Sequence, residues 1–133
     1  TQRVSQAVAF AAAVRYLQHL GMENVEAWEH ELGARLVEGV QKIDGVRLLG
    51  PTDPTKRAGL VALAIDGVHP HDVGQLLDTR GIAVRVGHHC AQPLHRCAGV
   101  TASTRASTYI YNTTEDVDAF LKALAEVRPY FGF

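Results

Sequence analysis

The densest group of chemically reactive side chains lies between positions 85 and 97. The segment reads Arg85-Val-Gly-His-His-Cys-Ala-Gln-Pro93, and His95 and Cys97 follow it. A thiol reacts as its thiolate, and positive charge from nearby arginine or histidine favours that form. The glycine and the proline of the segment indicate a shaped loop rather than the interior of a helix or strand. We therefore expect Cys90 to be a nucleophile on accessible, flexible backbone.

The same side chains allow two other interpretations. Zinc accepts ligands of the types found at His88, His89, Cys90, His95 and Cys97. Adjacent histidines rarely bind one ion from a rigid backbone, and the spacing of the two cysteines does not match a paired zinc motif. A lone cysteine in a small domain is more often a buried, unreactive side chain. The cluster of imidazole and guanidinium groups favours the nucleophile over both, and no metal site is predicted.

Two further positions carry candidate binding groups. Arg105 stands among the small residues Ala102, Ser103, Ala106 and Ser107, which leave room for a ligand. Its planar guanidinium can bind a carboxylate or a phosphate through two hydrogen bonds. His71 lies at the expected start of a helix, where spacing alone predicts a capping or solvent-exposed role.

Composition limits the classes of function. The chain has 133 residues, 47% apolar and 20% charged, which fits one ordinary domain with a real core. The net charge of −1 gives no basic field for nucleic acid or a membrane surface. The longest apolar run, positions 7–14, is far shorter than the roughly 20 residues that span a membrane. Two cysteines form no disulfide framework, so we expect a cytoplasmic protein. The start, Thr1-Gln-Arg without Met or a signal-peptide pattern, suggests a processed or excised piece.

Apolar periodicity predicts the elements that position these residues. Recurrence every three or four residues predicts helices over 3–20 and 24–43, the first of them a core helix. Leu60–Ile65 is nearly all apolar, so we expect a strand buried on both faces. The other expected elements are strands over 46–49, 82–85 and 104–110, and helices over 71–80 and 114–127, the last begun by a capping box of Thr113 and Asp116. This order predicts a two-layer α/β sandwich over 46–133 behind long helices over 3–43, the whole chain forming one domain.

Several motifs together resemble a known family. Arg85-Val-Gly-His-His-Cys-Ala-Gln-Pro, Arg105-Ala-Ser and Tyr111-Asn-Thr are similar to the C-terminal part of SufS-like, group II cysteine desulfurases. Gly67-Val-His-Pro-His-Asp and Asp78-Thr-Arg-Gly-Ile-Ala-Val match the same pattern. These enzymes are class V aminotransferases of fold type I that use pyridoxal 5'-phosphate and act as homodimers. The resemblance implies that this chain is the small C-terminal domain, with the cofactor-binding large domain outside it.

The resemblance also implies roles for individual residues. Cys90 would take sulfur from L-cysteine as a persulfide, with release of L-alanine. Arg105 would anchor the substrate carboxylate, Arg85 would make a second polar contact, and His88 and His89 would shape the loop or handle protons. Thr1 would contact the cofactor phosphate across the dimer.

Further implications concern the cofactor and the partners. Lys42 lies on an exposed helix face and Lys56 in a proline-flanked loop, and neither resembles a Schiff-base site, so the chain alone should be inactive. The sulfur would pass to an acceptor of SufU or SufE type for iron–sulfur cluster assembly, with His71 reaching the zinc of a SufU-type acceptor. A selenocysteine lyase and a non-catalytic domain that binds an acceptor or zinc remain alternatives.

Two further expectations concern Cys97 and the first two helices. Cys97 is either an inert thiol or a disulfide partner of Cys90. The apolar stripes of the first two helices exceed what a small sheet covers, so an exposed apolar patch is expected.

Overall fold

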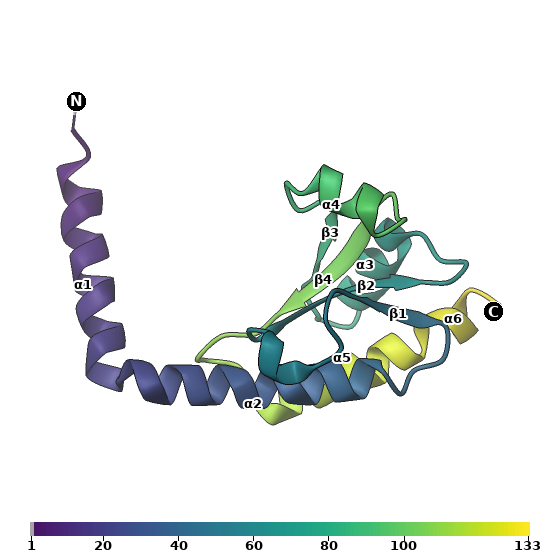
Figure 1. The fold of residues 1–133 in the computed structure, drawn as a ribbon, viewed down its shortest axis with the longest axis horizontal. Helices are drawn as coiled ribbons and strands as arrows, with labels where there is room; N and C mark the ends of the chain where they lie inside the picture. The colour runs from purple at the N-terminus through teal and green to yellow at the C-terminus, as the bar shows by residue number, and fades with distance from the viewer. Residues whose placement is uncertain (1) are drawn as a thin grey trace.

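A computed structural model describes residues 2–133, and its strands form one antiparallel sheet in the order β1-β2-β4-β3 (Figure 1). The strands are β1 (Val46–Leu49), β2 (Leu60–Ile65), β3 (Arg85–Gly87) and β4 (Ser103–Ser107). The helices are α1 (Val4–Leu20), α2 (Met22–Val40), the 3-10 turn η1 (Pro54–Lys56), α3 (Pro70–Asp78), α4 (Gln92–Cys97), α5 (Thr114–Ala125) and α6 (Val127–Tyr130). Because α2 and α3 contact the sheet and α5 contacts both of these helices, the predicted two-layer α/β architecture is confirmed.

The core lies between one face of the sheet and these helices. Along β2, Val61, Leu63 and Ile65 are buried, whereas the residues between them are not. Side chains alternate across a strand, so the pattern shows that helices cover a single face. The expectation that β2 is buried on both faces is therefore wrong. From the helices, the fully buried side chains of this core are Leu32, Leu36, Val37, Val40, Val73, Leu77, Val117, Leu124 and Val127.

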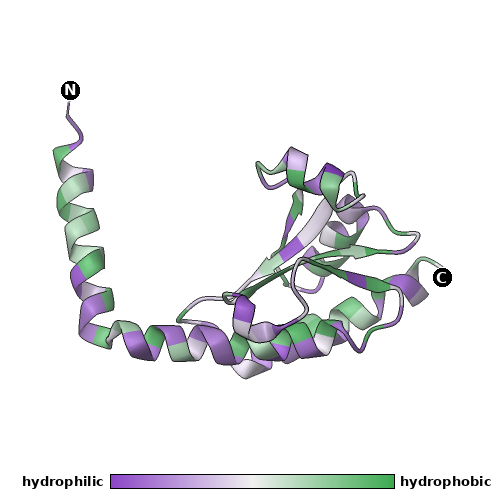
Figure 2. Cartoon of the chain, viewed as in Figure 1, coloured by the Kyte–Doolittle hydropathy of each residue, from purple (hydrophilic) through white to green (hydrophobic). Residues whose placement is uncertain are grey.

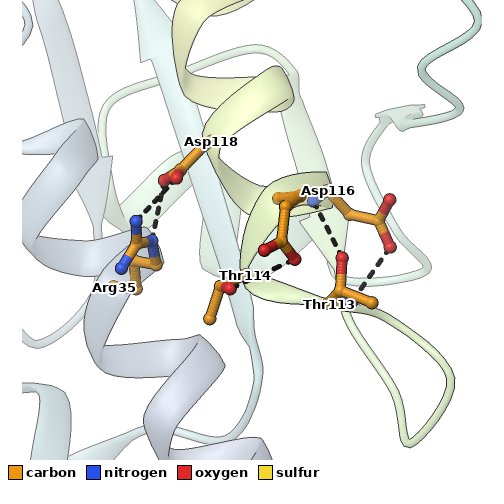
Figure 3. A network of polar contacts seen from close by, with 6 residues as sticks. Arg35, Thr113, Thr114, Asp116 and Asp118 are labelled. Carbon is orange, nitrogen blue, oxygen red and sulfur yellow. Dashed lines mark hydrogen bonds and ion pairs between the residues drawn. The ribbon is translucent and has the colours of Figure 1, made fainter.

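One group of polar contacts joins α2 to α5, and another caps the N-terminus of α5 (Figure 3). Arg35 donates from Nε and Nη2 to the two carboxylate oxygens of Asp118 at 2.7 and 2.6 Å. Those bonds lower the pKa of Asp118, although both side chains are about half exposed, and such pairs contribute little stability. At the start of α5, Thr113 Oγ1 accepts from the Asp116 amide and the Asp116 carboxylate accepts from the Thr113 amide. The predicted capping box is confirmed, but α5 ends at Ala125 and the short α6 follows it.

Helix α1 differs most from expectation. It stands clear of the sheet in Figure 1, and none of its residues is buried. Figure 2 shows that much of the same ribbon is hydrophobic. The prediction of a core helix is wrong, because the periodicity identifies an apolar stripe but nothing in residues 2–133 covers it. The expected exposed apolar patch is confirmed on this helix, where the exposed large side chains are Val4, Val8, Phe10, Val14, Tyr16 and Leu20.

The segment before the reactive loop is also different. Residues 82–84 have no strand partner, and the short β3 begins only at Arg85, so the predicted strand over 82–85 is wrong. Ile82 and Val84 instead pack against the edge of the core. After the loop, Pro93 lies in the first turn of α4, a helix that the sequence did not predict, where its missing amide costs nothing. Among residues 2–133, no helix combines the length and the apolar character that crossing a membrane requires.

Candidate functional site

Two arginines face each other on the sheet face that the helices leave open. Arg85 of β3 pairs directly with Arg105 of β4, and such opposed residues have Cβ atoms about 4.5–5.5 Å apart. Like charges at that position repel each other. Within residues 2–133 neither guanidinium forms an ion pair, and the Nε atom of Arg105 is buried without a hydrogen-bond partner. The arrangement offers two positive charges and an unused donor to an anion.

Cys90 lies on a tight turn that follows β3. The Ala91 amide donates to the His88 carbonyl oxygen at 2.8 Å and closes the turn. His89 and Cys90 have φ values of 51° and 58°, in the left-handed region. This conformation costs an L-residue about 1–2 kcal/mol, so the surrounding structure must hold it. The thiol of Cys90 is exposed, which agrees with an accessible nucleophile.

A buried histidine and a buried serine lie beneath the turn. His95 of α4 is 6% exposed, and its Nδ1 is 3.0 Å from the Ala91 carbonyl oxygen. Its Nε2 is 2.9 Å from Oγ of Ser103, a fully buried residue of β4. The Nε2 of His89 lies 3.0 Å from the same Oγ and 3.2 Å from the Ser103 carbonyl oxygen.

These contacts determine where the protons lie. A carbonyl oxygen only accepts, so His95 carries a proton on Nδ1 and His89 carries one on Nε2. In neutral His95, Nε2 then accepts from the Ser103 hydroxyl, whose oxygen accepts from His89. Sequence reasoning considered His95 only as a metal ligand and Ser103 only as a small neighbour of Arg105. No local pattern signals their contact, because it depends on how α4 packs.

The two histidines before Cys90 have different surroundings. His89 is half-buried, and burial is the main cause that lowers its pKa, followed by the charge of Arg105. The hydrogen bond to the Ser103 carbonyl raises that pKa, and His95 and Arg85 lower it further. His89 is therefore neutral near pH 7. His88 is exposed, with its ring edge-on to His95 at 5.9 Å between centroids.

The remaining predicted site residues lie elsewhere. His71 is exposed on α3, and its ring stacks on His69 with 5.4 Å between centroids. His69 is the N-cap, so α3 begins at Pro70 rather than at His71. Cys97 is a second exposed free thiol, on α4. Thr1 lies outside the described residues.

The geometry bears on the metal and cofactor interpretations. Across residues 2–133, no three side chains of His, Cys, Asp or Glu converge as a metal site requires. Both ring nitrogens of His95 are already engaged. A third lysine, Lys122, is exposed on α5 and was not considered in the prediction from sequence. Lys42 and Lys56 are exposed too, and none of the three lies on the strands that carry the arginines, so these residues do not form a Schiff-base site for pyridoxal phosphate.

Comparison with known proteins gives consistent relatives. The chain is 50% identical over 132 residues to the probable cysteine desulfurase 2 of Mycobacterium leprae (strain TN). The alignment covers 99% of this chain and 32% of the relative. The probable cysteine desulfurase of Halalkalibacterium halodurans is 46% identical with the same coverage. The chain thus spans about a third of the length of these curated relatives.

Solved structures agree with the sequence relatives. The apo cysteine desulfurase from Thermococcus onnurineus NA1 superposes with a TM-score of 0.91 at 38% identity, over 96% of this chain and 32% of that one. The cysteine desulfurase CsdA from Escherichia coli has a TM-score of 0.89 at 33% identity, over 98% and 32%. A profile of the family described as aminotransferase class-V matches residues 1–120. Because that match covers most of its 133 residues, the chain belongs to the aminotransferase class-V family.

Proposed function

We propose that this chain is the nucleophile-bearing and substrate-binding part of a SufS-like cysteine desulfurase. One observation carries the proposal: an exposed thiol on a constrained turn directly follows the strand whose Arg85 opposes Arg105. Relatives at 50% and 46% identity that are named probable cysteine desulfurases support it. In the intact protein the activity would convert L-cysteine to L-alanine and leave sulfur on Cys90.

Arg105 binds the carboxylate of L-cysteine in this proposal. Its buried Nε lacks a partner, and a carboxylate would accept from it and from a second nitrogen of the same guanidinium. Hydrogen bonds to charged groups contribute about 1.5–3 kcal/mol each. A carboxylate between Arg85 and Arg105 would also relieve their repulsion. The pair is thus arranged for an anionic substrate before it arrives.

Cys90 then receives the sulfur. The overall change balances without an oxidant: L-cysteine and the Cys90 thiol give L-alanine and a Cys90 persulfide. The carbon–sulfur bond of the substrate breaks, a sulfur–sulfur bond forms at Cys90, and a proton reaches the substrate carbon. His89 is neutral with Nε2–H donated to Ser103, so its Nδ1 lone pair can accept a proton. His88, which is exposed, would contribute to the shape of the turn.

The cofactor would be held by a part of the protein outside this chain. We propose pyridoxal 5'-phosphate because of the resemblance to SufS-like enzymes, although the lysines of this chain offer no site for it. When bound, that cofactor supplies the electron-withdrawing ring that makes cleavage at the substrate carbon feasible. The intact enzyme would be a cytoplasmic homodimer, with Thr1 contacting the cofactor phosphate of the partner subunit.

The sulfur would leave through an acceptor of SufU or SufE type. His71 supports this part of the proposal, because its imidazole is exposed on α3 rather than committed to the core. An exposed imidazole can reach a zinc ion held by a docked acceptor.

The test uses the intact protein that contains this chain, loaded with cofactor and supplied with L-cysteine. We expect alanine to form and mass spectrometry to find one added sulfur on Cys90. Cys90→Ser should abolish both, whereas Cys97→Ser, at the other exposed thiol, should retain both. A persulfide at Cys97, or full turnover by Cys90→Ser, would refute the proposal.

The same assay resolves the finer questions. Faster turnover of selenocysteine than of cysteine would instead assign a selenocysteine lyase. His71→Ala should weaken the stimulation by acceptor and spare basal turnover, and loss of both would exclude the acceptor role. The 133-residue chain alone, mixed with cofactor, should show no visible absorbance of protein-bound cofactor.

A further inference from the structure

We propose that His95 and Ser103 are positioning residues that fix the Cys90 turn relative to Arg105. Neither would touch the substrate. They would act by holding the two neighbours of Cys90 in place, and this role rests on the proposed function of Cys90 as the nucleophile.

The first anchor holds the residue after Cys90. The carbonyl oxygen of Ala91 accepts from the His95 amide at 3.1 Å and from His95 Nδ1 at 3.0 Å. The imidazole is buried, so water does not compete for these bonds. The Ala91 carbonyl is therefore fixed by both the backbone and the side chain of one residue.

The second anchor holds the residue before Cys90. Ser103 Oγ and the Ser103 carbonyl both lie within hydrogen-bond distance of His89 Nε2. Ser103 Oγ also contacts His95 Nε2, so the two anchors meet at one buried hydroxyl. Cys90 lies between the anchored residues with its thiol exposed. The left-handed conformations of His89 and Cys90 are unfavourable, and these contacts explain how the turn keeps them.

The same contacts relate the turn to the substrate site. Ser103 and Arg105 are two residues apart on β4, so their side chains lie on one face of the strand, about 6.6 Å apart along it. The group that holds the nucleophile and the group proposed to hold the substrate carboxylate thus share one rigid strand. Misplacement of reacting groups by 1 Å can reduce a rate about 100-fold. Rigid coupling through β4 would keep that error small.

Amide hydrogen exchange in the 133-residue chain tests the geometric claim. In His95→Met, an apolar side chain fills the space of the imidazole without its hydrogen bonds, and in Ser103→Ala the shared hydroxyl is lost. We expect the Ala91 amide to exchange at least about tenfold faster in both variants. Ser103→Thr keeps the hydroxyl and should restore protection, and His30→Met, on the exposed face of α2, is the matched control.

Nitrogen NMR of the imidazoles provides a second readout. We expect His95 as the Nδ1–H tautomer and His89 as the Nε2–H tautomer, and both should persist in Ser103→Ala, because the carbonyl oxygens of Ala91 and Ser103 remain as acceptors. Unchanged exchange at Ala91, or exchange that accelerates equally in the β2 core, would overturn the proposal. The first result would mean that the contacts do not restrain the turn, and the second that they only stabilise the fold.

Kinetics of the cofactor-loaded intact protein separate positioning from substrate binding. His95→Met should lower kcat for alanine formation by about 100-fold while KM for cysteine stays within about twofold, because Arg105 is untouched. A raised KM with unchanged kcat would contradict the positioning role. A turn that loosens as expected, in a protein that never forms a Cys90 persulfide, would support the geometry and refute the proposed function instead.

Discussion

Arg85 and Arg105 lie opposite each other in an arrangement that disfavours folding. Like charges directly opposite each other on two strands are destabilising, and the buried Nε of Arg105 has no partner. Arg105→Met keeps a long side chain and removes both penalties. We expect the free energy of unfolding to rise by about 0.5–1 kcal/mol in urea titrations, while cysteine turnover by the intact protein is lost.

Arg47→Met is the matched control for this prediction. Arg47 pairs with Ala64 on β2, on the same open face, but its Nη1 donates to the Ala98 carbonyl oxygen at 3.0 Å. Removing it should give no gain in stability. A decrease in stability of Arg105→Met would show that its charge is compensated in the folded chain.

At this same scale, the sequence predicts single residues better than their contacts. Cys90, Arg85 and Arg105 could be selected because residue type and neighbourhood carry the chemistry. The link of His95 to Ser103 could not be predicted, because it joins an unpredicted helix to a strand. The left-handed backbone at His89 and Cys90 escaped prediction too, since neither is a glycine.

At the scale of elements, the close approach of α2 and α5 depends on one glycine. A Cβ on Gly39 would lie 2.7 Å from Leu121 Cδ2 and 3.0 Å from Cγ, closer than atoms pack. Alanine improves helix propensity by up to about 1 kcal/mol, but overpacking costs about 1–3 kcal/mol. We therefore expect Gly39→Ala to lower the free energy of unfolding by about 1 kcal/mol in urea titrations.

A double-mutant cycle tests the cause. Leu121→Ala removes the clashing atoms, so adding Gly39→Ala in that background should stabilise the chain by a few tenths to about 1 kcal/mol. The sign of the Gly39 effect thus reverses. If Gly39→Ala destabilised both backgrounds equally, the cause of the destabilisation would be the α2 backbone rather than packing against α5.

Elements with strong local signals were predictable. The capping box of Thr113 and Asp116 and the four residues of β1 were identified because their patterns depend on adjacent residues. The strand over 82–85 and the burial of β2 on both faces were wrong, because each depends on which neighbour covers the segment. The apolar content of a segment indicates its tendency to be buried, whereas the elements that pack against it determine which of its side chains are buried.

At the scale of the whole molecule, apolar content and burial differ most in α1, which carries an apolar surface that no other part of residues 2–133 covers. Its 17 residues stand apart from the sheet, and Val8 and Phe10 are 63% and 72% exposed. Isolated helices shorter than about 12–15 residues are marginal in water, and α1 is only slightly longer. Burial of this surface against a second copy would remove it from water and stabilise the complex by about 25 cal/mol per Å² of apolar surface.

We expect the 133-residue chain to self-associate through α1, with a mass in sedimentation velocity that rises with concentration. Val8→Lys combined with Phe10→Lys should reduce it to a monomer, whereas two charges at Gln2 and Gln6 of the same terminal segment should not. A chain that stays monomeric throughout would contradict the self-association. Association that survives the Val8 and Phe10 substitutions would place the contact on another surface.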